Sequence, residues 1–279
     1  MKKRLDILLV ERGFFTSREK AKTAIMAGEV TVDGAVFDKP GMSVSEDAEI
    51  FHKGDKCPYV SRGGMKLEKA ISVFGIDLDG AICMDIGAST GGFTDCMLQN
   101  GASKVYAIDV GYGQLDYSLR TDERVINIER CNFRLFEDDP ENPVIVDRID
   151  FASIDVSFIS LKHIFPKCAD FLKDGARVCA LIKPQFEAGR EQVGKKGIVR
   201  DPEVHRSVIE NVIGYACDSG LACERLDFSP IRGGKGNIEY LILLNKGAEI
   251  SYNEMSGIIE KVVSEAHKSL DGLKATEDD

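Results

Sequence analysis

The chain has 279 residues, of which 43% are hydrophobic and 29% are charged, a composition typical of a soluble globular protein. Its formal net charge of −10 argues against a broadly basic nucleic-acid-binding surface. No apolar run reaches the ~18 residues that a membrane-spanning helix needs, and the basic first residues have no apolar stretch after them, so we expect no secretory signal. Eight cysteines without a Cys-x-x-Cys pair and four scattered histidines predict reduced thiols in a cytoplasm, no disulfide framework and no metal site.

Residues 1–51 are predicted to form a small separate module of two helices and short strands. The apolar spacing from Leu5 to Val10 indicates one helix, and Ser17 can cap a second over 18–27. Short strands are expected at 30–32, 35–37 and 49–51, with a tight turn at 33–34. The first 22 residues contain seven basic side chains and three acidic ones. Because phosphate binding depends on local charge, the acidic total does not exclude RNA binding by this module.

A polar stretch at 52–60 contains Gly and Pro and reads as a linker. A helix is then expected from about residue 61 to 74, and apolar strands alternate with helices from residue 80 onward. The expected strands are 81–86, 104–108, 125–129, 149–155, 176–182 and 239–244. The expected helices are 91–100, 113–119, 160–172, 202–218 and 253–270. This alternation predicts an α/β fold with a mostly parallel sheet and one antiparallel strand at its edge.

The strand at 81–86 runs into a glycine-rich turn that is typical of nucleotide-like cofactor sites. Its candidate cofactor-binding residues are Asp85, Gly87, Ser89, Gly91, Gly92 and Phe93. A dinucleotide loop needs a glycine where Ser89 stands, and Asp85 would repel a pyrophosphate. S-adenosylmethionine has a sulfonium and an amino group but no phosphate, so it tolerates both the side chain of Ser89 and the charge of Asp85. Asp109, after the next strand, could accept its ribose hydroxyls. The alternative is a strand–turn–helix junction whose glycines serve packing alone.

Two further side chains follow strands at the edge where parallel sheets bind ligands. Asp155 ends the strand at 149–155, and Lys183 ends the one at 176–182. Burial at a strand mouth would lower the pKa of Lys183 and make it a base or an orienting group. The alternatives are a helix-capping acid for Asp155 and a lysine that reaches solvent for Lys183. A long loop at 185–201 is a candidate lid. Lys66 and Glu239, taken singly, are weak candidates for catalytic residues.

Five ordered motifs together resemble the TlyA family of bacterial ribosomal RNA 2′-O-methyltransferases, often labelled haemolysin A. They are Tyr59-Val-Ser-Arg-Gly-Gly-Met-Lys-Leu67, Asp85-Ile-Gly-Ala-Ser-Thr-Gly-Gly-Phe-Thr-Asp95, Asp155-Val-Ser-Phe-Ile159, Ile182-Lys-Pro-Gln-Phe-Glu187 and Gly236-Asn-Ile-Glu239. The catalytic half is similar to the FtsJ-like ribose methyltransferases, which implies a Rossmann-like class I methyltransferase sheet. Residues 1–51 resemble the small RNA-binding domain named after ribosomal protein S4, through Ser17-Arg-Glu-Lys-Ala-Lys22 and Gly28-Glu-Val-Thr-Val-Asp-Gly34.

This resemblance implies a Lys-Asp-Lys-Glu catalytic set, which falls on Lys66, Asp155, Lys183 and Glu239. It implies S-adenosylmethionine as cofactor, and ribosomal RNA or a ribosomal subunit as the cytoplasmic partner, with no membrane. The residues expected to bind RNA are Arg4, Arg18, Lys20, Lys22 and Arg62. The methyltransferase domain is expected at 61–272 and a disordered tail at 273–279. The competing functions are methylation of a small molecule or protein, and a haemolysin or other non-enzymatic ribosome-binding protein.

Overall fold

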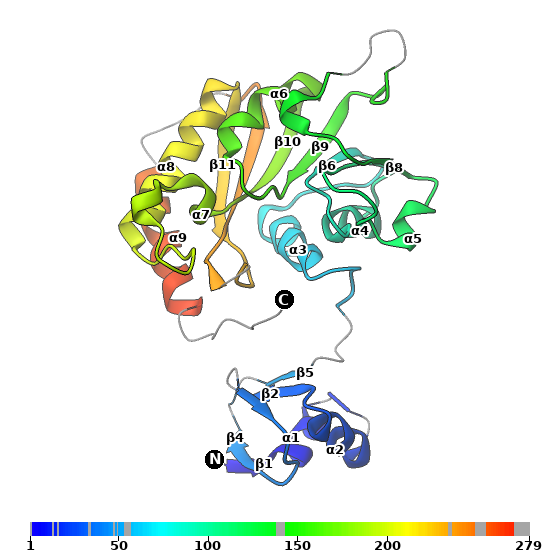
Figure 1. The fold of residues 1–279 in the computed structure, drawn as a ribbon, viewed down its shortest axis with the longest axis vertical. Coiled ribbons are helices and arrows are strands. Elements are labelled where there is room, and N and C mark those ends of the chain that lie inside the picture. The colour runs from blue at the N-terminus through cyan, green and yellow to red at the C-terminus, as the bar shows by residue number, and fades with distance from the viewer. Residues whose placement is uncertain are drawn as a thin grey trace. The chain divides into compact units, whose positions relative to one another are not determined.

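The structure is a computed structural model that divides into two compact units, residues 1–57 and 58–271 (Figure 1). The residues it describes are 2–12, 14–15, 17–32, 35–46, 48, 50–52, 57–137, 143–233, 236–248 and 255–270. The predicted turn at 33–34 and the predicted tail at 273–279 lie outside the described residues. Of the predicted linker, His52 ends a strand and Pro58 begins the second unit.

The first unit packs two helices with two small antiparallel sheets. Its elements are β1 (Lys2–Arg4), α1 (Leu5–Glu11), α2 (Arg18–Met26), β2 (Val30–Val32), β3 (Ala35–Phe37), β4 (Ser43–Ser45) and β5 (Ile50–His52). Strand β2 pairs with β3 and β5, and β1 pairs with β4. The apolar faces of α1 and α2, including Leu5, Leu9 and Ile25, are fully buried in its core. The side chain of Ser17 caps α2 by accepting from the backbone N–H of Lys20.

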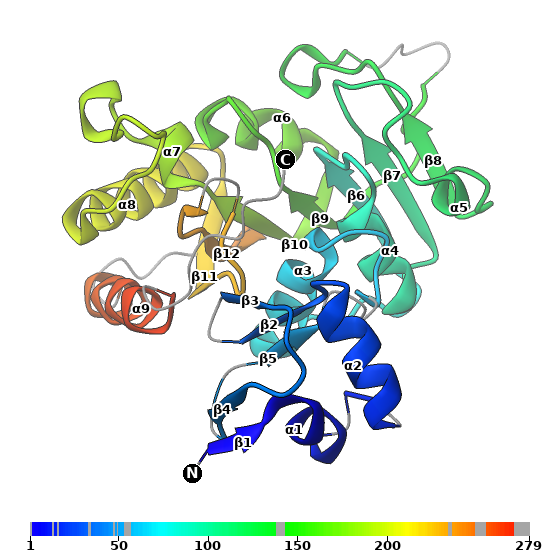
Figure 2. The ribbon, with the colours of Figure 1, turned by 60° about the horizontal axis from the view of Figure 1, so that its bottom comes forward.

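The second unit is built on one seven-stranded sheet (Figure 2). Its strands are β6 (Ile82–Ile86), β7 (Lys104–Ile108), β8 (Val125–Ile128), β9 (Ile149–Ile154), β10 (Leu172–Ile182), β11 (Leu221–Phe228) and β12 (Tyr240–Lys246). Its helices are α3 (Gly63–Phe74), α4 (Gly92–Gln99), α5 (Tyr117–Arg120), α6 (Phe165–Phe171), α7 (Pro184–Glu187), α8 (Pro202–Asp218) and α9 (Met255–Leu270), with 3-10 turns η1 (Phe133–Leu135), η2 (Leu161–His163) and η3 (Arg190–Gln192). Helices α3 and α4 lie together near β6, whereas α8 and α9 lie together at β11 (Figures 1 and 2).

The strand order is β11-β12-β10-β9-β6-β7-β8, and β12 is antiparallel to both of its neighbours. The predicted parallel sheet with an antiparallel strand is therefore confirmed. Strand β11, which has no counterpart among the predicted strands, pairs with the outer side of β12. Since Ile182 pairs with Tyr240, β12 begins at the edge where β10 ends. The carboxyl ends of five parallel strands, β10, β9, β6, β7 and β8, and the start of β12 thus meet at one edge.

Candidate active site

The turn from β6 into α4 has the backbone conformation that its glycines allow. Gly87 has φ 88° and Gly91 has φ 97°, values in the left-handed region that favours glycine. A Cβ on Gly87 would lie 2.5 Å from the carbonyl oxygen of Asp155, and one on Gly91 would collide with Leu119. These two glycines let the turn pass close to the end of β9 and to α5. Gly92 begins α4, on which Phe93 is buried.

Asp85 is fully buried at the end of β6 and is held by two hydroxyl groups. Thr94 Oγ1 donates to Asp85 Oδ2 at 2.6 Å, and Ser153 Oγ donates to Oδ1 at 2.9 Å. Burial raises the pKa of Asp85 to about 6, although both hydrogen bonds oppose the rise. Asp85 has no exposed surface, so a direct contact with a ligand would require neighbouring groups to move.

Asp109 follows β7 and stays partly open at the edge of a small surface hollow. It accepts from the backbone N–H of Ser89 at 2.8 Å and of Gly111 at 2.6 Å. The hollow is also lined by Ala88, Gln114, Leu115, Asn127 and Glu129. Two carboxylates among apolar and amide groups fit a nucleoside that carries positive charge, and they would repel a pyrophosphate. The residues present therefore fit S-adenosylmethionine.

The four predicted catalytic residues meet in one buried chain of ion pairs. Lys66 Nζ on α3 lies 2.7 Å from Glu239 Oε2, just before β12, and 3.9 Å from Asp155 Oδ2. Lys183 Nζ lies 2.6 Å from Asp155 Oδ1. The side chains of both lysines are 11% exposed and that of Glu239 is 2% exposed. Two cations and two anions therefore share a largely dry site.

The protonation of this site follows from its charges. Burial alone would lower the pKa of Lys66, but Asp155 and Glu239 outweigh it, and the pKa is raised. Burial would likewise raise the pKa of Asp155, but Lys66 and Lys183 outweigh it, and the pKa is lowered. Lys66 is thus a permanent ammonium and Asp155 a permanent carboxylate at neutral pH. Lys66 is therefore unsuited to act as a base.

Three groups beside the ion pairs were missed by the sequence analysis. Ser157 Oγ accepts from Lys183 Nζ at 3.0 Å. The Phe158 side chain is 90% exposed, has φ 64° and packs against Phe186 with ring centroids 4.9 Å apart. The motif at 155–159 contains Ser157 and Phe158, but nothing in a sequence reveals an exposed aromatic ring with a left-handed backbone.

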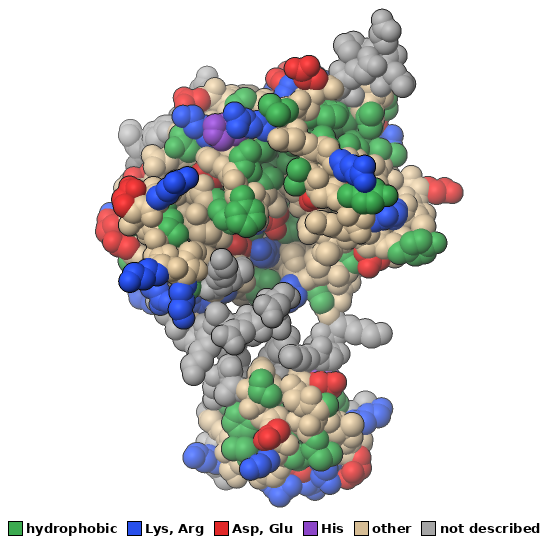
Figure 3. Space-filling model, in the orientation of Figure 1, with side chains coloured by type: hydrophobic (Ala, Val, Ile, Leu, Met, Phe, Trp, Pro, Cys, Tyr) green, Lys and Arg blue, Asp and Glu red, His purple; other side chains and the backbone are tan. Residues whose placement is uncertain are grey.

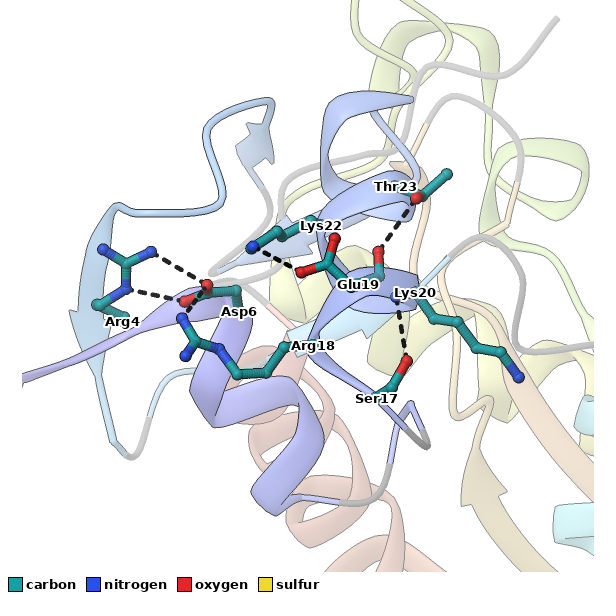
Figure 4. Close-up of polar contacts among 8 residues, drawn as sticks. All are labelled: Arg4, Asp6, Ser17, Arg18, Glu19, Lys20, Lys22 and Thr23. Carbon is teal, nitrogen blue, oxygen red and sulfur yellow. Dashed lines mark hydrogen bonds and ion pairs between the residues drawn. The ribbon is translucent and has the colours of Figure 1, made fainter.

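The first unit carries most of the residues expected to bind RNA (Figure 4). Arg4 donates to both oxygens of the buried Asp6, and Arg18 Nη2 donates to Asp6 Oδ2 at 2.8 Å. The Arg4 hydrogen bonds, with help from Arg18, lower the pKa of Asp6 to about 2 despite its burial. Lys22 pairs with Glu19 at 2.8 Å. Lys20 is exposed on α2, and basic side chains gather at the lower edge of this unit in Figure 3.

The predicted residue Arg62 belongs to the second unit. It is exposed and precedes α3 as its N-terminal capping residue. The candidate lid at 185–201 contains α7 and η3. Near its end, Val199 N–H donates to Asn237 Oδ1 at 3.0 Å, and Asn237 Nδ2 donates to the Gly197 carbonyl at 2.9 Å. These bonds tie the end of the loop to the segment that carries Glu239. No helix within the described ranges is long and apolar enough to cross a membrane.

Comparison with known proteins accounts for both units. The profile of FtsJ-like methyltransferases matches residues 59–246, and that of the S4 domain matches residues 3–50. The chain is 39% identical over 265 residues to a Mycobacterium tuberculosis protein named 16S/23S rRNA (cytidine-2′-O)-methyltransferase TlyA, covering 94% of this chain and 97% of that protein. The chain belongs to the TlyA family.

Two further relatives are similar to most of this chain. Hemolysin A of Brachyspira hyodysenteriae is 44% identical, with 85% of this chain and 98% of that protein covered. A solved structure from Streptococcus thermophilus, named as a hemolysin, is 50% identical, covers 97% of both chains and superposes with a TM-score of 0.75. The TlyA membership and the FtsJ-like and S4 domains inferred from the sequence are thus confirmed.

Proposed function

We propose that this TlyA protein is an S-adenosylmethionine-dependent methyltransferase that modifies a ribose 2′-hydroxyl of ribosomal RNA. The observation that carries the proposal is the chain of ion pairs through Lys66, Asp155, Lys183 and Glu239, which lies next to the cofactor turn. The names of the TlyA relatives, the FtsJ-like match and the S4 match support it.

The cofactor would lie against the turn at Gly87 and the hollow at Asp109. Asp109 would accept its ribose hydroxyls, and Ser89 holds Asp109 in place through its backbone N–H. S-adenosylmethionine, when bound, supplies a methyl group already activated by its sulfonium. The protein must then align a ribose hydroxyl with that methyl group and handle the hydroxyl proton.

Lys183 is the group we assign to the hydroxyl. Its Nζ is fixed between Asp155 and Ser157, so it can hold the 2′-oxygen in line with the methyl group. Before it can take the hydroxyl proton at Nζ, the Lys183 ammonium must give one of its own protons to solvent, and Asp155 then stabilises the ammonium that forms again. Lys66 lies on the other carboxylate oxygen of Asp155, Oδ2, and helps to hold it in place. Glu239 neutralises the charge of Lys66. Phe158 offers an exposed ring on which a base of the substrate can stack.

The RNA would be bound by the first unit and by Arg62. Arg4 and Arg18 both pair with the single carboxylate of Asp6. The cluster of these three side chains therefore keeps a net positive charge that can attract phosphate. Because the whole chain is acidic, we propose a folded ribosomal subunit, rather than free RNA, as the substrate. Such a substrate places the protein in the cytoplasm.

The test is transfer of tritiated methyl from S-adenosylmethionine to purified ribosomal subunits, with mapping of ribose methylation on the RNA. Wild type should methylate RNA at a 2′-oxygen. Lys183→Ala should lose on the order of 100-fold in rate or more while binding the cofactor normally. Lys261→Ala, which removes an exposed lysine of α9, is the matched control. Label in protein, or ribosome binding without methyl transfer, would favour the competing functions and overturn the proposal.

A further inference from the structure

The two segments that carry Asp155 and Lys183 are joined well beyond that ion pair. The segment after β9 runs from Asp155 to η2, and the segment after β10 is α7. Lys183 donates to Ser157, and the ring of Phe158 packs on the ring of Phe186. The contacts therefore continue along both segments, away from the reacting groups.

Glu187 makes the last of these connections with both of its carboxylate oxygens. Oε2 accepts from the hydroxyl of Ser160 at 2.6 Å, and Oε1 accepts from the backbone N–H of Leu161 at 2.8 Å. Burial raises the pKa of Glu187, against the effect of these two hydrogen bonds. A partly buried carboxylate engaged at both oxygens is a rigid clamp between two loops.

Phe158 explains why such a clamp is needed. A bulky residue with a positive φ is strained, by about 1 to 3 kcal/mol, and keeps that conformation only when its surroundings impose it. The exposed ring has few neighbours to impose it, since 90% of its surface is open. Two contacts hold the loop on either side of Phe158. Asp155 pairs with Lys183 before it, and Ser160 donates to Glu187 after it.

We propose that Glu187 is a positioning residue for methyl transfer: it clamps the loop at 155–161 to α7, which keeps Phe158 and Asp155 in register with Lys183. This inference rests on the proposed function, since it assigns Glu187 a part in that same site. Glu187 touches none of the reacting groups, so it acts through the loop. Loosening the loop should misalign the acceptor while leaving the hollow at Asp109 unchanged.

The chain lacks tryptophan, so Phe158→Trp introduces a single indole into the loop. In that background, Glu187→Ala should lower the steady-state fluorescence anisotropy of the indole toward the value of the unfolded chain, because the ring of an unclamped loop rotates more freely. Glu187→Gln should restore most of the anisotropy, since an amide can accept from Leu161 and donate to the hydroxyl of Ser160. Glu191→Gln, in the exposed turn that follows, is the control and should change nothing.

In the otherwise wild-type protein, Glu187→Ala should lower kcat on the order of 10- to 100-fold, with the S-adenosylmethionine Kd unchanged by calorimetry. The double variant Glu187→Ala/Phe158→Ala should be no slower than the slower single variant, because both changes remove the same ordered loop. Ser160→Ala removes the clamp from the other side and should give a smaller loss. It also serves as the test if Glu187→Ala does not fold.

Multiplicative losses in the double variant, or an indole anisotropy equal to that of the control, would overturn the role of Glu187. A wild-type protein that methylates no RNA would overturn the proposed function instead, whereas the anisotropy of the indole would still decide whether Glu187 orders the loop.

Discussion

Asp85→Asn tests whether the first acid of the cofactor turn is a buried structural group or a ligand-facing one. The carboxyl has its pKa raised from 3.8 to about 6 by burial. The unfolded chain therefore releases this proton at lower pH than the folded chain does. Stability is lost as the pH rises from about 4 to about 6, and at about 1.4 kcal/mol per pH unit the loss is about 3 kcal/mol.

An asparagine cannot ionise, yet it can accept from one hydroxyl and donate to the other. The free energy of unfolding of Asp85→Asn, relative to wild type, should therefore rise by about 3 kcal/mol between pH 4 and pH 7. Urea unfolding followed by circular dichroism at several pH values measures it. Asp174→Asn, at an exposed position of β10, is the control and should show no such rise.

A difference that stays constant over this pH range would refute the reasoning, and so would one that falls as the pH rises. The affinity for S-adenosylmethionine is a second test of whether Asp85 contacts the cofactor. If the carboxylate stays with Thr94 and Ser153, Asp85→Asn should change the S-adenosylmethionine Kd little. Asp109→Asn, at the open edge of the hollow, should weaken it about 10-fold or more, because it removes a charged hydrogen-bond acceptor.

Three further changes probe the rest of the chain. Asp6→Asn should cost about 2 kcal/mol at pH 7, and because the folded pKa is lowered to about 2, the difference should vanish as the pH falls from 4 toward 2 in urea unfolding. Gly91→Ala should destabilise by about 2 to 4 kcal/mol, since a Cβ there has a left-handed backbone and meets Leu119; unchanged thermal unfolding would contradict this. Lys66→Met should cost about 3 to 5 kcal/mol because Glu239 loses its partner. Adding Glu239→Gln to Lys66→Met should restore the free energy of unfolding but not methyl transfer, when urea unfolding and methyl transfer are measured on the same variants.

The strands of the sheet were predictable to different degrees, for physical reasons. Strand β6 is buried after its half-buried first residue and reads as a mostly apolar run, so its expected range differs from the observed one by a single residue. Strand β11 is only half-buried and carries Glu224, Arg225 and Asp227 among its apolar residues, which hides it from a search for apolar runs. Strand β1 is three basic residues, and only its pairing with β4 makes it a strand.

The site shows the same division between local and distant information. Acids and a lysine at strand ends are a local pattern, and Asp155 and Lys183 could be predicted from it. Lys66 and Glu239 are 173 residues apart, and nothing local indicates that their side chains meet. Only the order of the family motifs singled them out. The hydroxyl groups that hold Asp85 were equally invisible, because Ser153 comes from a strand 68 residues away.

The charges of the first unit bear on the kind of RNA surface this protein suits. Of the seven basic residues near the N-terminus, Lys3 pairs with Glu11, Lys22 with Glu19, and both arginines at Asp6 share that one carboxylate. Three acids thus offset part of the seven basic charges, and the local excess is modest. Electrostatic attraction to phosphate grows with the number of neutralised phosphates. A small excess gives weak binding to free RNA, so selectivity must come from a surface whose shape presents several phosphates and one ribose together. The folded ribosomal subunit that we propose as the substrate meets that requirement, whereas a flexible RNA strand does not.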